Sequence, residues 1–180
     1  MIPAPSLFTS SGHRKYLSAS ERKRFLKVAE NRRREERLLC LTLLWTGGRL
    51  SEVLALQPAN ISPDEGVVVF RTLKKRSQQI YRQVPVPKSL LIELANGPRF
   101  PWARTQAWTV VKSVMREANI SGPQATPRGL RHSFAVHAVT SGVPLHLIQR
   151  WLGHSRMETT AIYSQALGPE ERSIAKRMWD

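Results

Sequence analysis

The sequence contains a single cysteine and few acidic residues, and each shortage excludes a class of site. One cysteine, Cys40, excludes an internal disulfide and a metal site built from several cysteines. It lies in the apolar run 38–45, which predicts a buried and unreactive thiol. The 13 Asp and Glu residues, against 28 Lys and Arg, form no cluster that indicates a metal site. We therefore expect no metal and no other cofactor.

Long apolar segments are also absent. No run reaches the roughly 18 residues that a membrane-spanning helix needs, and residues 1–16 lack the apolar stretch of a secretory signal. At 180 residues, 41% of them hydrophobic, the chain is long enough to bury one good core. We expect a globular, cytoplasmic protein with no membrane partner.

Positive charge, by contrast, is in large excess, with a formal net charge of +15. Solubility alone needs only roughly 2 to 8 charges of either sign. An excess of this size on a small domain points to a polyanion, most often nucleic acid. The basic residues are spread over the whole length, whereas an anionic membrane surface would favour one basic amphipathic helix. The charge predicts the class of partner and nothing about chemistry.

Hydrophobic periodicity predicts a mainly helical protein with one β-hairpin. A capping box at Ser18 and Glu21 begins the first helix, and Gly47 and Gly48 end the second. The other predicted elements are helices over 38–45, 50–56, 88–95, 105–119, 128–141, 145–152, 158–163 and 170–178, and strands over 67–70 and 78–86 joined by a tip at 73–77.

Residues 1–16 show no periodicity and contain two prolines and a glycine, which predicts a flexible N-terminal arm. Two alternatives remain open for this arm. It either orders on DNA, with Arg14 and Lys15 as its candidate contacts, or it stays loose.

Arg49 is the first candidate for phosphate binding. It follows Gly48 directly and lies between two predicted buried helices, an unusual place for a solvated side chain. The guanidinium group suits a two-pronged grip on phosphate. Glu52 lies three residues further on the same helix face. It either holds Arg49 in place or is an ordinary surface carboxylate.

The first turn of the helix over 128–141 carries a second group of candidates, Arg128, Arg131 and His132. Spacings of three and four place them on one face, and the free N–H groups of a helix N-terminus already attract anions. The alternatives are a salt-bridged surface for the arginines and a packed histidine for His132.

Two further candidates lie near the end of the chain and one group lies on the hairpin. Gly153 ends a helix and presents His154, and Tyr163 closes the next helix. Taken singly, His154 is a structural histidine and Tyr163 an amphipathic aromatic residue. The hairpin tip contains Lys74, Lys75 and Arg76, which either enter a DNA groove or form a charged solvent turn.

Three segments together resemble the signature boxes of the tyrosine recombinase family, which comprises phage integrases and Xer-type recombinases. They are TGGRLSEVLAL (46–56), GLRHSF (129–134) and LGHSRMETTAIY (152–163), and a basic hairpin lies between the first two. The resemblance runs from about Tyr16 to the end of the sequence. It implies that residues 17–180 form a catalytic domain of the α+β class, mainly α-helical, with a small antiparallel sheet. Family members usually also have an N-terminal core-binding domain. We expect it to be absent here, so that the chain is either a minimal version or an excerpt.

The resemblance assigns roles to the candidate residues. Arg49 and Arg131 correspond to the two arginines that grip the phosphate, His154 to the hydrogen-bond donor of the third box, and Tyr163 to the nucleophile. The family's hairpin lysine, which protonates the leaving oxygen, falls on Lys74 or Lys75. We favour Lys74, which leaves Lys75 and Arg76 as DNA contacts. Glu52 matches the acidic residue that often follows the first arginine. We expect His132, like Glu52, to contact the catalytic residues and not the substrate itself.

Residue 128 departs from the family pattern. The second box usually begins with a histidine, and Arg128 stands in its place. An arginine can donate hydrogen bonds to a phosphoryl oxygen, but it cannot relay a proton. If the family's histidine helps to deprotonate the tyrosine, that help is either weakened here or comes from another group.

The resemblance implies a site-specific recombinase that cleaves and rejoins double-stranded DNA through a 3′-phosphotyrosine intermediate. Such an enzyme needs no ATP and no small-molecule substrate, works as a homo-oligomer, a tetramer on DNA, and is associated with the nucleoid. The alternatives are a catalytically impaired DNA-binding or accessory protein of the same fold and a topoisomerase-like nicking and closing enzyme.

Overall fold

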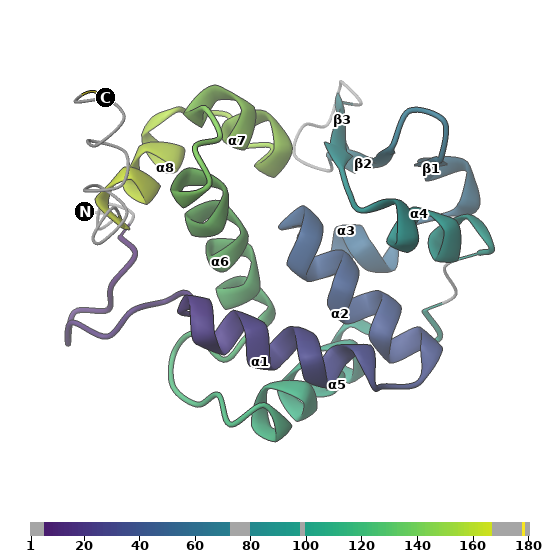
Figure 1. Ribbon diagram of the computed structural model, residues 1–180, viewed down its shortest axis with the longest axis horizontal. Helices are drawn as coiled ribbons and strands as arrows, with labels where there is room; N and C mark the ends of the chain where they lie inside the picture. The colour runs from purple at the N-terminus through teal and green to yellow at the C-terminus, as the bar shows by residue number, and fades with distance from the viewer. Residues whose placement is uncertain (1–5, 73–79, 98–99, 167–177, 179–180) are drawn as a thin grey trace.

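The computed structural model describes residues 6–72, 80–97, 100–166 and 178, and within them the fold is mainly helical with a small sheet (Figure 1). The predicted α+β class is confirmed. The helices are α1 (Ala19–Glu30), α2 (Arg34–Thr46), α3 (Leu50–Leu54), α4 (Lys88–Ala95), α5 (Arg104–Glu117), α6 (Pro127–Thr140), α7 (Leu145–Leu152) and α8 (Glu158–Ala161), with 3₁₀ turns η1 (Pro58–Asn60) and η2 (Ile162–Ala166).

The sheet is antiparallel, in the order β1 (Ile61–Ser62), β2 (Val67–Thr72), β3 (Ile80–Pro85). The predicted hairpin is confirmed as β2 and β3, with Phe70 opposite Arg82. Strand β1 was not predicted, because two residues leave no alternating pattern. The predicted tip, with Lys74, Lys75 and Arg76, lies outside the described residues, as does most of the helix predicted over 170–178.

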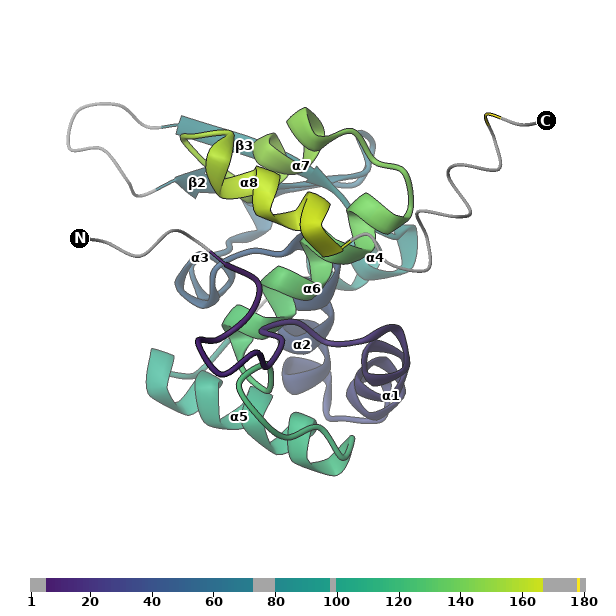
Figure 2. The ribbon, with the colours of Figure 1, turned by 90° about the vertical axis from the view of Figure 1, so that its left-hand side faces the viewer.

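Helices α2 and α6 form the centre of the molecule and pack against each other. Figures 1 and 2 show α1 and α5 on one side of this pair, and β2, β3, α7 and α8 on the other. Helix α2 is buried almost all round, as its sequence predicts. Cys40 lies within it, fully buried, and burial raises the pKa of its thiol to about 12. The burial expected for this thiol is confirmed.

Residues 6–16 differ from the loose arm that composition predicts. Leu7 is fully buried in the core, and Phe8 and Arg14 form a β-bridge across a turn. The Leu17 N–H donates to Ser133 Oγ of α6 at 2.6 Å. A single apolar anchor such as Leu7 leaves no periodicity in the sequence, so its packing could not be predicted. The chain is therefore held to the body of the domain at Leu7 and Leu17, and Leu17 bonds directly to α6.

Candidate active site

Gly47 makes the turn that brings the first candidate arginine to the site. It ends α2 in the left-handed conformation, with φ of 60°. A Cβ at this position would come within 2.5 Å of Phe134 Cδ1 and 2.9 Å of Leu152 Cδ2. Helices α6 and α7 therefore approach this turn so closely that only glycine fits. Arg49 follows at the N-cap of α3.

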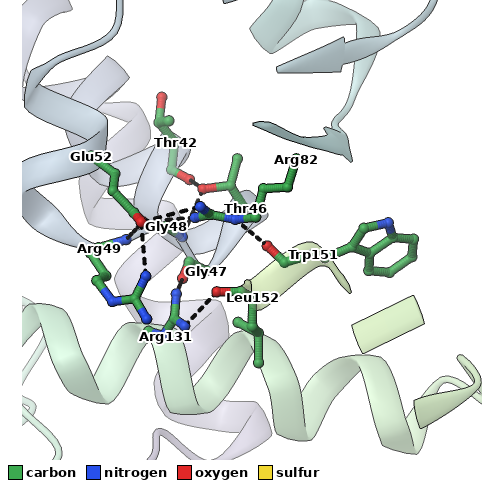
Figure 3. Close-up of polar contacts among 10 residues, drawn as sticks. All are labelled: Thr42, Thr46, Gly47, Gly48, Arg49, Glu52, Arg82, Arg131, Trp151 and Leu152. Atoms are coloured by element: carbon green, nitrogen blue, oxygen red, sulfur yellow. Dashed lines mark hydrogen bonds and ion pairs between the residues drawn. The ribbon is translucent and has the colours of Figure 1, made fainter. Parts of the chain in front are cut away.

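Glu52 holds Arg49 by two hydrogen bonds. The Arg49 backbone N–H donates to Oε2 and Arg49 Nη1 donates to Oε1, both at 2.8 Å (Figure 3). Burial alone would raise the pKa of Glu52. Hydrogen bonds from Arg82 and the charges of Arg82 and Arg49 more than offset it, so that the pKa lies below its ordinary value. Glu52 is thus an ionised, buried carboxylate and not a solvated surface residue.

Arg82 on β3 is the site residue that the sequence did not reveal. It donates from Nη1 and Nη2 to the two Glu52 oxygens at 3.1 and 2.7 Å, and from Nε to the Trp151 carbonyl at 2.7 Å. Its guanidinium also lies over the Phe70 ring. The sequence did contain a signal for the burial of Arg82. It lies between Ile80 and Val84 on the strand face whose other residues are apolar. An arginine on the buried face of a strand needs a buried carboxylate.

Arg131 joins the first box to the third. It is 8% exposed, and it donates from Nη1 to the Gly47 carbonyl at 2.7 Å and from Nη2 to the Leu152 carbonyl at 2.6 Å. Figure 3 shows its guanidinium near that of Arg49. Burial, with a smaller effect of Arg49, lowers the pKa of Arg131 to about 10, which still leaves it cationic at neutral pH. Two fixed positive charges therefore lie at one place.

Tyr163 lies in η2 with its ring 1% exposed. Its hydroxyl is 3.0 Å from His132 Nδ1, and its ring is nearly parallel to that of His154, at 11°. Burial raises the pKa of Tyr163, although the charges of Arg131 and Arg128 oppose the change. The hydroxyl is therefore a neutral phenol beside the second box.

His132 is uncharged at neutral pH. Burial is the main cause, and the charges of Arg128, Arg131 and Lys15 add to it, so that the pKa of the ring falls to about 4. Arg128 itself lies exposed on the first turn of α6 and acts on His132 and Tyr163 through its charge. The packed histidine that the sequence allowed as an alternative is observed, and it contacts the candidate nucleophile.

His154 is oriented by a residue that the sequence also did not reveal. Gly153 ends α7 with φ of 65°, and His154 Nδ1 then meets Thr160 Oγ1 of α8 at 2.9 Å. Thr160 is fully buried. The contact fixes the histidine of the third box relative to the helix that precedes Tyr163.

The remaining candidates are placed as follows. Arg14 forms an ion pair with Glu21 of α1 at 2.9 Å. Lys74, Lys75 and Arg76 fall in the part of the chain that is not described. In the described ranges, no group of three or more His, Cys, Asp or Glu could hold a metal ion. The described helices include none that is long and apolar enough to cross a membrane.

Comparison with known proteins identifies the family. Residues 88–168 match the phage integrase family. Over 169 residues the chain is 32% identical to the tyrosine recombinase XerA of Thermococcus kodakarensis, which covers 84% of this chain and 58% of that protein. The chain carries a tyrosine recombinase catalytic domain. The resemblance seen in the three boxes is confirmed.

Solved structures agree with this assignment. The catalytic domain of bacteriophage HP1 integrase matches the recombinase domain with a TM-score of 0.70 and 27% identity, over 89% of this chain and 93% of that one. The site-specific recombinase XerH, in a pre-cleavage complex with its difH substrate, has the same fold. Its TM-score is 0.70 at 20% identity, over 99% of this chain and 56% of that one. The chain spans about three fifths of the length of the curated relatives it matches, 58% and 61% for the first two.

Proposed function

We propose that this recombinase domain cleaves and rejoins DNA strands at specific sites through a 3′-phosphotyrosine on Tyr163. One observation carries the proposal. The Tyr163 hydroxyl contacts His132, the residue next to Arg131, and Arg131 is bonded to the backbone of both the first and the third box. The candidate nucleophile therefore contacts α6 at the residue next to the candidate phosphate-binding group.

The proposed chemistry follows from the residue types. A phosphodiester resists attack because its negative charge repels nucleophiles, and in the transition state that charge spreads over the non-bridging oxygens. Arg49, Arg131, His154 and the exposed Arg128 supply donors and positive charge there. Fixed electrostatic stabilisation of this kind is usually the largest catalytic contribution. The rigidity of Arg131, held by two carbonyls, and of Arg49, held by Glu52, supports this role.

Strand cleavage begins when the Tyr163 oxygen attacks phosphorus and the 5′-oxygen leaves. We assign to Lys74 the role of the acid that protonates this leaving oxygen. The phosphotyrosine conserves the energy of the bond, so a 5′-hydroxyl of a partner strand can reverse the reaction without ATP. Tyr163 is 1% exposed in the free domain. Binding of DNA must therefore uncover its hydroxyl before attack.

Double-stranded DNA is the proposed partner. The net charge of +15 supports it, as does the similar fold of XerH, which was solved with its DNA substrate. Lys75, Arg76, Arg14 and Lys15 remain candidate contacts to the backbone. Exchange between two duplexes requires four strands to be cut, so we propose that a tetramer assembles on DNA, at the nucleoid. Residues 17–180 form the proposed catalytic unit.

A covalent-adduct assay tests the proposal. The substrate is a pool of duplexes with random sequence around a nick, placed so that the short 5′-hydroxyl fragment diffuses away after cleavage. We expect an SDS-stable protein–DNA adduct with the native chain and none with Tyr163→Phe. An adduct that survives Tyr163→Phe contradicts the proposal. Salt-dependent DNA binding without any adduct would instead identify a non-catalytic DNA-binding protein.

A further inference from the structure

The second box lacks the residue that would accept a proton from the nucleophile. Arg128 stands where the family usually has a histidine, and a guanidinium group stays protonated at any physiological pH. His132 lies four residues further along, one helical turn away on the same face of α6. Its Nδ1 is 3.0 Å from the Tyr163 hydroxyl. We propose that His132 has taken over this function, and that it accepts the Tyr163 proton as the phenol oxygen attacks DNA. This inference rests on the proposed function of Tyr163.

The geometry suits a general base. A base must lie within hydrogen-bond distance of the proton that it removes, and 3.0 Å meets that condition. Among the described residues, the Tyr163 hydroxyl has no other hydrogen-bond partner, so its proton can point at Nδ1. Arg131 lies close enough to Tyr163 for the charge of each to act on the other. A phosphate held by Arg131 would therefore lie near the phenol oxygen and its acceptor.

The charged residues around the His132 ring make its affinity for a proton depend on whether DNA is bound. The charges of Arg128 and Arg131 of α6 and of Lys15 of the N-terminal segment act on His132. The Tyr163 ring lies 5.9 Å from the His132 ring and is stacked on that of His154. The three cations oppose protonation of the ring, and its Nε2 is buried with no partner in the described structure. A DNA phosphate bound by Arg128 and Arg131 neutralises part of that field. Occupancy by the substrate therefore raises the affinity of the ring for a proton at the time when one must be removed.

The proton and electron pairs balance without another reactant. The phenol O–H bond breaks and its proton passes to Nδ1, while the oxygen forms a bond to phosphorus. The bond from phosphorus to the 5′-oxygen breaks, and that oxygen takes a proton from the separate acid. Negative charge moves to the phosphoryl oxygens near Arg49 and Arg131. In the reverse step a 5′-hydroxyl attacks, and the His132 imidazolium returns its proton to Tyr163.

The decisive variant is His132→Asn, tested with the same nicked pool. Its amide oxygen can accept a hydrogen bond close to the place of Nδ1 but cannot take up a proton. Loss of a general base lowers rates by about 10²- to 10⁴-fold, so we expect adduct formation to slow at least 100-fold with unchanged DNA affinity. The native rate rises with pH as the ring loses its proton, and this dependence disappears in the variant. The control is His137→Asn, an exposed position on the same helix, which retains the native rate.

Two results would overturn the inference and leave the proposed function intact, and a third would reject both. An adduct rate for His132→Asn within about threefold of native, with the same pH profile, leaves the recombinase intact and removes the role of His132. A DNA substrate with sulfur in place of the leaving 5′-oxygen needs no acid, because thiols are far more acidic than alcohols. If this substrate restores the rate of adduct formation in His132→Asn, then His132 acts on the leaving group and not on Tyr163. Absence of any Tyr163-dependent adduct from the native protein rejects the proposed function itself, and the role of His132 with it.

A measurement on the unsubstituted side chain guards against misfolding of the variant. Nitrogen NMR of histidine-labelled protein reports the state of each imidazole. We expect the His132 resonances to shift in Tyr163→Phe, and the pKa of the ring to rise when a mixed-sequence duplex is added. A ring that responds to neither change contradicts the inference.

Discussion

Glu52 and Arg82 form a two-pronged ion pair whose side chains are each only 3% exposed. Arg82 also donates to the Trp151 carbonyl, and Glu52 also accepts from Arg49. The pair therefore connects β3, α3 and α7, which carry parts of two boxes. Its effect on the site is indirect, since it fixes the backbone from which Arg49 and His154 project.

Removal of one partner of this pair should be costly. We expect Arg82→Met to lower the free energy of unfolding by about 3–5 kcal/mol, because a buried carboxylate loses its principal partner. Urea denaturation measures the change. Arg71→Met, at an exposed position on the paired strand β2, should change stability by less than about 0.5 kcal/mol. A cost for Arg82→Met as small as that of the control would show that Arg49 alone satisfies Glu52.

Gly47→Ala should damage both stability and cleavage. The left-handed backbone costs about 1–2 kcal/mol for a residue with a Cβ, and a Cβ 2.5 Å from Phe134 Cδ1 forces repacking that costs about 1–3 kcal/mol more. Gly66→Ala is the matched control, because its φ is also positive, at 72°, but nothing lies within 4 Å of the added Cβ. Thermal unfolding and adduct yield measure the two effects. Equal losses in the two variants would mean that the close approach of α6 is not needed.

The stability of the domain should fall as the pH is lowered from about 6.5 to about 4, partly because of His132. Its pKa is lowered to about 4 in the folded state, from an ordinary value of 6.5. Between these values the unfolded chain binds the proton and the folded chain does not, so protons favour unfolding by up to about 1.4 kcal/mol per pH unit. Urea denaturation at several pH values should show a shallower slope in His132→Asn. His146→Asn, at an exposed position of α7, should leave the native slope unchanged; a native slope in His132→Asn would contradict the assignment.

Thr160→Val should impair cleavage more than binding. Valine fills the same buried space but cannot bond to His154 Nδ1, which lies 2.9 Å from the threonine oxygen. A lost hydrogen bond of about 1 kcal/mol corresponds to about a fivefold slower adduct formation. Thr159→Val, at the preceding, partly exposed position, is the control. A slowing of equal size in the control would mean that the His154 contact is unimportant.

The sequence predicted the residues that define the boxes but not the contacts that hold them. Arg49, Arg131 and His154 each follow a local signal, a glycine turn or a helix start, whereas Tyr163 was identified by its place in the third box. The contact between His132 and Tyr163 joins residues 31 positions apart, and the pair of Glu52 and Arg82 joins residues 30 positions apart. Such contacts depend on how helices and strands approach each other in space. The hydrophobic periodicity of a single segment carries no information about that approach.

The burial of some residues could be predicted from the sequence and that of others could not, because burial also depends on how distant segments pack. The apolar surface of α2 predicted its central place, whereas the burial of Tyr163 could not be predicted from a short polar helix. Leu7 likewise belongs to no sustained apolar pattern of helical or strand period. Its burial depends on a surface that the rest of the core provides.

The concealment of Tyr163 has a consequence for the proposed activity. A chain with a net charge of +15 is expected to bind DNA of any sequence during a search for its target. Because the Tyr163 hydroxyl is covered, such a chance encounter would leave the strand uncut. The proposed enzyme would then break only a site whose phosphate can reach the covered hydroxyl.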